Sequence, residues 1–184
     1  VVLDERTVKT PHSRSPLIVP TRELAEAAAA EWAAQGETVD PASMPVTSIA
    51  STALDLDAHR DDLVTTIARH GETDPVCYWV TEPARLREWQ HAYWQPLLDW
   101  LALTYDARLN VTTGLLPIDQ PPDATKALTD TVADLDRFHL AALSASVAAT
   151  TSLVIGLALM DRRLDADAEE RQRRHGGGER VRRP

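Results

Sequence analysis

Few side chains in this sequence of 184 residues have the types and the spacing that catalysis requires. Cys77 is the single cysteine, and a thiol nucleophile needs a His and an Asn or Asp that the fold brings beside it. It stands within the apolar run Val76–Val80, which favours an inert, buried thiol. The sequence therefore predicts a protein that is not an enzyme. A small hydrolase that uses Cys77 or a His and Asp pair is the alternative.

Metal and nucleotide sites are not indicated either. The histidines are scattered, without the close spacing of His and carboxylate residues that metal sites show. The seven glycines form neither a Walker loop nor a dinucleotide-binding pattern. The segment His59-Arg60-Asp61-Asp62 copies a triplet of the protein-kinase catalytic loop, but no other kinase motif accompanies it. We therefore expect no metal and no cofactor. The six histidines are His12, His59, His70, His91, His139 and His175.

The charge of the chain is unevenly distributed. The formal net charge is -9, yet the last 14 residues, 171–184, are rich in arginine. The acidic body would repel phosphate backbones, which argues against nucleic acid as a partner. One cysteine excludes an internal disulfide, and no secretory signal opens the chain, so we expect a reducing compartment.

One stretch imitates a membrane span. Phe138–Met160 contains no Asp, Glu, Lys or Arg and is long enough to cross a bilayer as a helix. Serine and threonine residues dilute it, and no aromatic belt flanks it. We therefore predict a buried core helix, broken near Thr150-Thr151-Ser152, and no insertion into a membrane. A membrane-associated adaptor that uses this stretch is a second alternative.

Apolar periodicity and capping residues predict an α+β fold that is mainly α. Val1–Val19 is typical of the remnant of a hairpin. A strand or a buried extended segment is expected over Val76–Val80, and a further strand over Arg108–Leu116. Pro96 should interrupt a helix that begins near Pro83. The other expected helices cover Arg22–Gln35 after the cap Thr21, Val46–Leu54, Ala58–His70 after the cap Asp57, Ala124–Leu135 and Phe138–Met160.

The order of short motifs resembles the assembly chaperones of the F1 sector of ATP synthase, in the branch that holds the alpha subunit. This branch is the mitochondrial F1 assembly factor 2 type, and the chain is similar to its alphaproteobacterial members. The resemblance covers residues 1–163. The motifs are Val8-Lys9-Thr10-Pro11, Leu17–Thr21, Ala30-Glu31-Trp32 with Gln35-Gly36, Pro41–Pro45 with Thr47, Ala50–Asp55, Gly71–Asp74, Cys77-Tyr78, Gln90 with Trp94–Leu97 and Trp100, and Gln120-Pro121-Pro122.

The resemblance implies a small N-terminal β-rich domain followed by a larger helical domain. We assign residues 1–19 to the end of the β-rich domain, whose first strands are expected before Val1. Residues 20–168 form the helical domain, and residues 169–184 form a flexible basic tail. The family's C-terminal helix, with its Gln and Trp-Gly signature, is not found after Leu164.

The function that the resemblance implies is stoichiometric binding of unassembled alpha subunit until beta displaces it. Asp55, Asp74 and Gln120 are the candidate partner-binding residues, because they are polar, match family motifs and follow predicted helices or turns. We expect a monomer. It would act in the cytoplasm of a bacterium, or in the mitochondrial matrix if the chain is eukaryotic.

Overall fold

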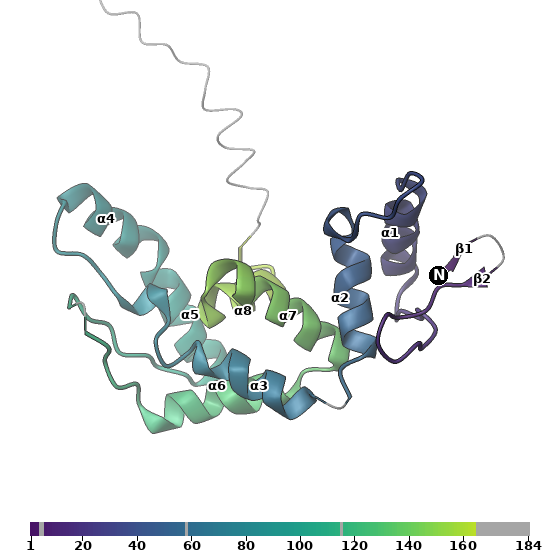
Figure 1. Ribbon diagram of the computed structural model, residues 1–184. Helices are drawn as coiled ribbons and strands as arrows, with labels where there is room; N and C mark the ends of the chain where they lie inside the picture. Colours follow the sequence, from purple (N-terminus) through teal and green to yellow (C-terminus); the bar gives the residue numbers. More distant parts are fainter. Residues whose placement is uncertain (4–5, 58, 115, 165–184) are drawn as a thin grey trace, which may run out of the picture.

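The computed structural model describes residues 1–3, 6–57, 59–114 and 116–164. Helices follow one another along the chain after a small N-terminal hairpin (Figure 1). The assignment of residues 1–19, 20–168 and 169–184 to separate parts stays a prediction, and the predicted tail lies outside the described residues. The elements are β1 (Val2–Leu3), β2 (Arg6–Thr7), α1 (Arg22–Ala33), η1 (Pro41–Ser43), α2 (Pro45–Leu54), α3 (Arg60–Arg69), η2 (Pro75–Cys77), α4 (Ala84–Tyr93), α5 (Gln95–Tyr105), α6 (Pro122–Asp134), α7 (Arg137–Thr150) and α8 (Leu153–Met160), where η marks a 3-10 helix.

Backbone hydrogen bonds hold the N-terminal segment together. β1 pairs antiparallel with β2, and an isolated antiparallel bridge joins Lys9 to Pro16. The Val1 amino group donates to the carbonyl oxygen of Leu17 at 2.8 Å, and the Leu17 side chain is fully buried. These contacts confirm the hairpin. Together with the helices they confirm an α+β fold that is mainly α.

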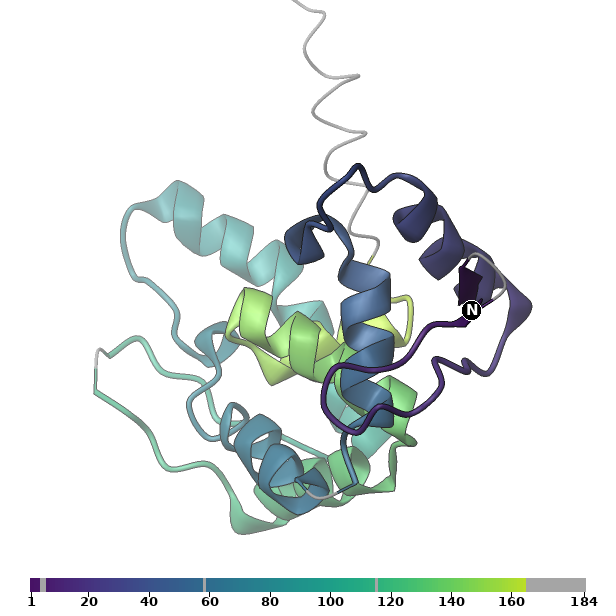
Figure 2. The ribbon, with the colours of Figure 1, turned by 45° about the vertical axis from the view of Figure 1, so that its right-hand side comes forward.

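The core lies where α3, α5, α6, α7 and α8 meet. α7 packs against α8, and α3 lies beside α6 (Figures 1 and 2). Burial of each large apolar side chain stabilises the fold by about 1.5–3 kcal/mol relative to exposure. Apolar side chains without contact to solvent therefore hold these helices together. The largest of them are Ile67, Val76, Leu101, Leu128, Val132, Leu140, Leu143, Val147, Leu153, Val154 and Leu157.

Two helical parts extend from this core toward opposite ends of the molecule (Figure 1). At one end α1 packs against α2, and α2 is joined to the core through α7. At the other end α4 packs against α5. The predicted interruption at Pro96 is confirmed, because α4 ends at Tyr93 and α5 begins at Gln95.

The apolar stretch Phe138–Met160 is broken into two helices, as predicted. α7 ends at Thr150, and Thr151 adopts the left-handed conformation with a φ of 56°. Ser152 then caps α8, because its hydroxyl oxygen accepts a hydrogen bond from the Ile155 N–H at 3.0 Å. Among the described residues, no helix combines the length and the apolar character that a membrane span requires.

Among the described residues, neither Val76–Val80 nor Arg108–Leu116 forms a strand, so the strand prediction is wrong for both. The alternative of a buried extended segment holds only for the part of Val76–Val80 that follows Cys77. Pro75–Cys77 forms the 3-10 helix η2, because Asp74 Oδ1 accepts a hydrogen bond from the Val76 N–H at 3.1 Å and turns the chain at its start.

Tyr78 forms an isolated parallel bridge to Thr112. In it the Trp79 N–H donates to the Thr112 carbonyl oxygen at 2.7 Å, and the Thr112 N–H donates to the Cys77 carbonyl oxygen at 2.9 Å. The apolar run and the partly alternating run therefore meet at one isolated bridge and form no β-ladder among the described residues.

Asp57 does not cap α3, contrary to the prediction. His59 occupies the cap position without a capping bond from its side chain. The Asp57 carboxylate instead pairs with the Arg137 guanidinium at 3.0 Å. This ion pair joins the loop before α3 to the first residue of α7.

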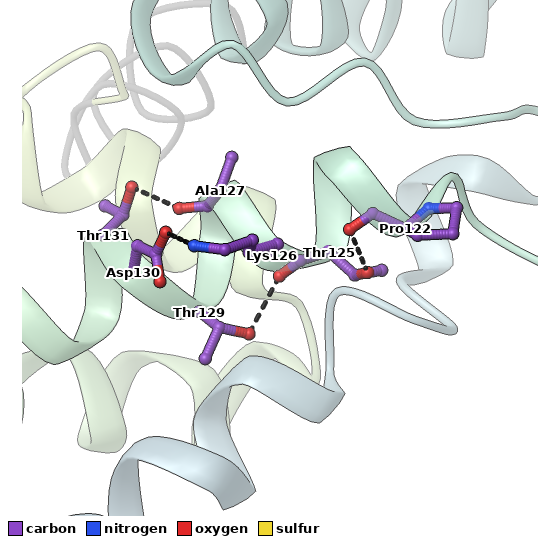
Figure 3. Close-up of polar contacts among 7 residues, drawn as sticks. All are labelled: Pro122, Thr125, Lys126, Ala127, Thr129, Asp130 and Thr131. Atoms are coloured by element: carbon purple, nitrogen blue, oxygen red, sulfur yellow. Dashed lines mark hydrogen bonds and ion pairs between the residues drawn. The ribbon is translucent and has the colours of Figure 1, made fainter.

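The polar side chains of α6 find their partners within their own helix (Figure 3). Lys126 pairs with Asp130 one turn later. Three threonine hydroxyls donate to backbone carbonyl oxygens one turn earlier, at 2.8–3.0 Å, in the pairs Thr125–Pro122, Thr129–Thr125 and Thr131–Ala127. These side chains satisfy their hydrogen-bonding groups within α6, and none of their bonds joins α6 to another described element.

Candidate functional site

The polar side chains of α6 bond within their own helix, whereas a set of polar side chains from the sequence motifs bonds to other parts of the chain. Each one binds backbone groups of another segment of the chain through its carboxylate or amide. We call these five the clamp residues. They are Glu31, Asp55, Asp74, Gln90 and Gln120.

Asp55 follows α2 and binds the N-terminal segment. Its Oδ1 accepts hydrogen bonds from Thr10 Oγ1 at 2.7 Å and from the Ser13 N–H at 3.0 Å, and the Ser13 hydroxyl also donates to it. Its Oδ2 accepts from the His12 N–H at 3.2 Å. Burial alone would raise the pKa of Asp55, but the hydrogen bonds from Ser13, Thr10 and His12 outweigh burial and lower the pKa to about 2.

The stability that Asp55 contributes should be lost in acid. Its pKa is lowered from 3.8 to about 2, so the contribution is complete above pH 4 and disappears as the pH falls toward 2. Because Asp55 is partly exposed, we expect about 1 kcal/mol after screening by solvent. Urea unfolding of the wild type and of Asp55→Asn across this pH range measures the contribution. Thr10→Val should reduce it too, and parallel pH curves for the wild type and Asp55→Asn would contradict the expectation.

A mainly apolar cavity of about 390 Å³ opens beside Asp55. Its walls come from the N-terminal segment, α1, η1 and α2. The indole Nε1 of Trp32 is buried and has no hydrogen-bond partner among the described residues. The volume falls within the range of ligand pockets, and the cavity brings Asp55 and Trp32 to one place. Its lining includes Val8, Pro11, Trp32, Val39, Met44 and Asp55.

Glu31 clamps α1 to the start of α2. Its carboxylate accepts hydrogen bonds from the N–H groups of Val46 and Thr47, both at 2.7 Å. Burial raises the pKa of Glu31, but the hydrogen bonds from Thr47 and Val46 outweigh burial, and the pKa is lowered overall. We did not predict this role, because a helix cap is normally the residue just before the helix, whereas Glu31 precedes Val46 by 15 residues.

Asp74 is fully buried and caps two helices at once. Besides the Val76 N–H of η2, its carboxylate accepts from Ser152 Oγ at 2.7 Å and from the Val154 N–H at 3.0 Å, at the start of α8. Burial raises the pKa of Asp74, and the hydrogen bonds from Val154, Ser152 and Val76 act in the opposite direction. With no exposed surface, Asp74 can affect a partner only through the helices that it holds.

The side-chain amides of Gln90 and Gln120 each hydrogen-bond to a backbone N–H and a backbone carbonyl oxygen, as an adjacent β-strand would. Gln120 Oε1 accepts from the Asn110 N–H at 2.7 Å, and Gln120 Nε2 donates to the Asn110 carbonyl oxygen at 3.2 Å. Gln90 Oε1 accepts from the Val80 N–H at 2.8 Å, and its Nε2 donates to the Tyr78 carbonyl oxygen at 3.4 Å. These amides fix the two segments for which strands were predicted.

The structure does not gather the predicted residues into one site. Asp74 lies close to Cys77, whose N–H donates to the Asp74 carbonyl oxygen at 2.9 Å. Gln120 binds Asn110, two residues before Thr112, whose N–H donates to the Cys77 carbonyl oxygen at 2.9 Å. Asp55 instead lies with the N-terminal segment at the end of α2. Partner binding by Asp55, Asp74 and Gln120 therefore stays a prediction, and the hydrogen bonds that they form are those of structural residues.

The groups that the hydrolase alternative requires are poorly placed for catalysis. Cys77 is fully buried, and burial, with the nearby Asp74 charge, raises the pKa of its thiol to about 12. A His and Asp pair does occur, between His139 and Asp136, but both side chains are exposed and Asp136 serves as the cap of α7. Among the described residues, no group of three or more His, Cys, Asp or Glu side chains could hold a metal ion.

A family model described as ATP12 chaperone protein matches residues 1–102. This chain belongs to the ATP12 chaperone family. The crystal structure of Atp12 from Paracoccus denitrificans is 37% identical in sequence, with a TM-score of 0.81, and the match covers 95% of this chain and 79% of that one. A single-residue mutant of that protein gives a TM-score of 0.82 at 37% identity and covers 100% of this chain and 80% of the mutant chain.

A protein of Agrobacterium tumefaciens, to which a chaperone role is ascribed, is 31% identical with a TM-score of 0.81, covering 98% of this chain and 70% of that one. The predicted resemblance is thereby confirmed, and as an ATP12 family member the chain is an ATP synthase assembly chaperone. The hydrogen bonds of the clamp residues join separate segments of this chaperone and thereby stabilise its fold.

Proposed function

We propose that this ATP12 family member binds the unassembled alpha subunit of the F1 sector and gives it up when the beta subunit arrives. The match to the ATP12 chaperone model carries the proposal. The choice of alpha over beta is supported by the order of the sequence motifs. An unassembled subunit exposes apolar surface that its neighbour would cover, and such surface aggregates.

Binding of this kind is stoichiometric and requires no catalytic group. The chaperone must hold its client firmly enough to prevent aggregation and loosely enough to be displaced, so a modest and partly polar interface suits it. We propose that the chain acts as a monomer, without a cofactor and without catalytic activity. The relatives come from bacteria, which supports action in the cytoplasm.

Asp55 and Gln120 are partly exposed, so they are proposed as contact residues as well as clamp residues. Asp74 is proposed to act indirectly, by fixing η2 and α8. Alanine substitution separates the two roles for the exposed pair. Because both residues also clamp backbone, alanine should lower the melting temperature in either case, so alpha binding is measured well below it, where each variant is folded. There a contact residue should weaken alpha binding, whereas the variant of a purely structural residue should bind like the wild type.

The full-length chain should keep separately expressed alpha subunit soluble and co-elute with it in size-exclusion chromatography. Beta subunit, expressed in the same way, should aggregate whether or not the chain is present. Addition of beta to the complex should release the chain. Absence of an alpha complex, or equal protection of beta, would show that the proposed specificity is wrong.

A further inference from the structure

The segment 108–112 forms its backbone hydrogen bonds along one edge. Both backbone groups of Asn110 are bound by the Gln120 amide, at 2.7 and 3.2 Å. Both backbone groups of Thr112 bond to the neighbouring segment 77–79, at 2.9 and 2.7 Å. Residues two apart in an extended chain direct their backbone groups to the same edge, so this edge is filled.

The opposite edge of the segment is open. By the same alternation, Leu109 and Val111 direct their N–H and carbonyl groups away from the Gln120 amide. None of these four groups hydrogen-bonds to another residue that the structure describes. A row of unpaired backbone groups is a template for a further strand. We call the backbone groups of Leu109 and Val111 the open edge.

A groove of about 550 Å³ lies between residues 108–111 and α5. Residues 108–111 form one wall, and the other wall includes Leu98, Ala102 and Leu103 of α5. The side chains of Leu103 and Val111, on the two walls, are 87% and 41% exposed. The groove therefore combines unpaired backbone groups with exposed apolar side chains. An added strand uses the first for affinity and the second for specificity.

The open edge is held in place before any partner arrives. The Leu109 side chain is 8% exposed and belongs to the hydrophobic core. Asn110 Nδ2 donates to the Asp119 carbonyl oxygen at 3.0 Å, in addition to the two bonds of the Asn110 backbone. A segment that is already fixed loses little conformational entropy when it binds a partner.

We propose that the open edge binds an extended segment of the unassembled alpha subunit as an added strand. The inference rests on the proposed function. The backbone of the client segment would bond to Leu109 and Val111, and its alternate side chains would cover Leu103 and Val111. Unpaired strand edges, like exposed apolar surface, drive the aggregation of incomplete proteins. A chaperone that pairs with such an edge would block this route.

The backbone chemistry of the open edge distinguishes this occupant from others. The backbone groups of a helix are already paired with one another, so a helix does not match the edge. In a symmetric dimer each copy's segment would have to enter the other's groove, and the two copies of α5 would be forced together. Residues 165–184 contain three consecutive glycines and one β-branched residue, Val181, a composition that disfavours a strand.

Amide hydrogen exchange, measured by NMR on the full-length chain, tests the inference residue by residue. In the free chain the Thr112 N–H should exchange slowly and the Val111 N–H quickly, because only the first is hydrogen-bonded. In the complex with alpha subunit, exchange at Val111 should slow at least about tenfold. If a complex forms and exchange at Val111 is unchanged, the inference is wrong and the proposed function stands.

A matched pair of substitutions separates the backbone from the side chain. Val111→Pro removes an N–H of the open edge, whereas Val111→Thr keeps it and is also β-branched. We expect the proline variant to bind alpha at least about tenfold more weakly, and the threonine variant to bind like the wild type. Equal binding by the proline variant would contradict the inference.

A second variant keeps the test decisive if circular dichroism shows that Val111→Pro has lost helix. Leu103→Asp places a charge on the opposite wall of the groove and should weaken alpha binding. Leu116→Asp is its control, because Leu116 is 79% exposed and does not line the groove. Equal binding by the two aspartate variants would also contradict the inference.

Three other outcomes would overturn the inference. A wild type that fails to bind alpha overturns the proposed function together with it. Self-association in sedimentation that Val111→Pro abolishes would identify a second copy as the occupant. Slow exchange of the Val111 N–H in the free chain that becomes fast when residues 165–184 are removed would identify this segment as the occupant.

Discussion

Replacement of Asp74 by alanine is expected to lower the free energy of unfolding by about 3–4 kcal/mol. The carboxylate is fully buried and accepts hydrogen bonds from Val76, Ser152 and Val154. Alanine would leave these donors without partners inside the protein, where water cannot replace the lost acceptor. Urea unfolding followed by far-ultraviolet circular dichroism measures the loss.

Asp40 supplies a matched control for this substitution. It also precedes a proline and caps a 3-10 helix, with its Oδ1 accepting from the Ala42 N–H at 3.1 Å, but it is exposed. Asp40→Ala should therefore cost about 1 kcal/mol or less, because water can satisfy the freed donor. Equal losses for the two substitutions would contradict the role assigned to Asp74.

Replacement of Gly156 by valine should lower the free energy of unfolding by about 3 kcal/mol. A Cβ at this position of α8 would lie 2.9 Å from Leu143 Cδ1 and 3.0 Å from Val147 Cγ2, both on α7. Leu143 and Val147 are buried, and Val147 is stiff, so the two helices would have to separate. Thermal and urea unfolding measure the effect.

Gly36 is the control for Gly156, because a Cβ built there meets no atom within 4 Å. Gly36→Ala should change the free energy of unfolding by no more than about 0.5 kcal/mol. Gly156→Ala should fall between the two, since alanine favours helix by about 1 kcal/mol but still crowds Leu143. If Gly156→Val is as stable as the wild type, α7 and α8 do not pack as closely as described.

The helices were predictable because their evidence is local. Thr21 caps α1, and the hydroxyl residues at Thr150–Ser152 break the long apolar stretch, as their types suggest. The strands could not be judged in this way. An apolar or alternating run forms a strand only if another strand lies beside it, and here the backbone groups of Asn110 are bound by the Gln120 amide instead.

The clamp residues show a second limit of local evidence. The pair Asp74-Pro75 predicts a turn, and that part is correct. Nothing near Asp74 indicates that it also caps α8, because Ser152 and Val154 follow it by 78 and 80 residues. The family resemblance selected Asp55, Asp74 and Gln120 as distinctive residues, but their hydrogen bonds became visible only in the folded chain.

The distance along the chain between Asp74 and its partners also bears on the synthesis of the protein. Translation proceeds at about 5–20 residues per second, so Asp74 would be made on the order of 4–16 s before Val154, which follows it by 80 residues. Until then the carboxylate and the apolar side chains that α8 later covers have no α8 to bind. The growing chain, still attached to the ribosome, therefore exposes apolar surface that α8 later covers, and exposed surface of this kind is prone to aggregation.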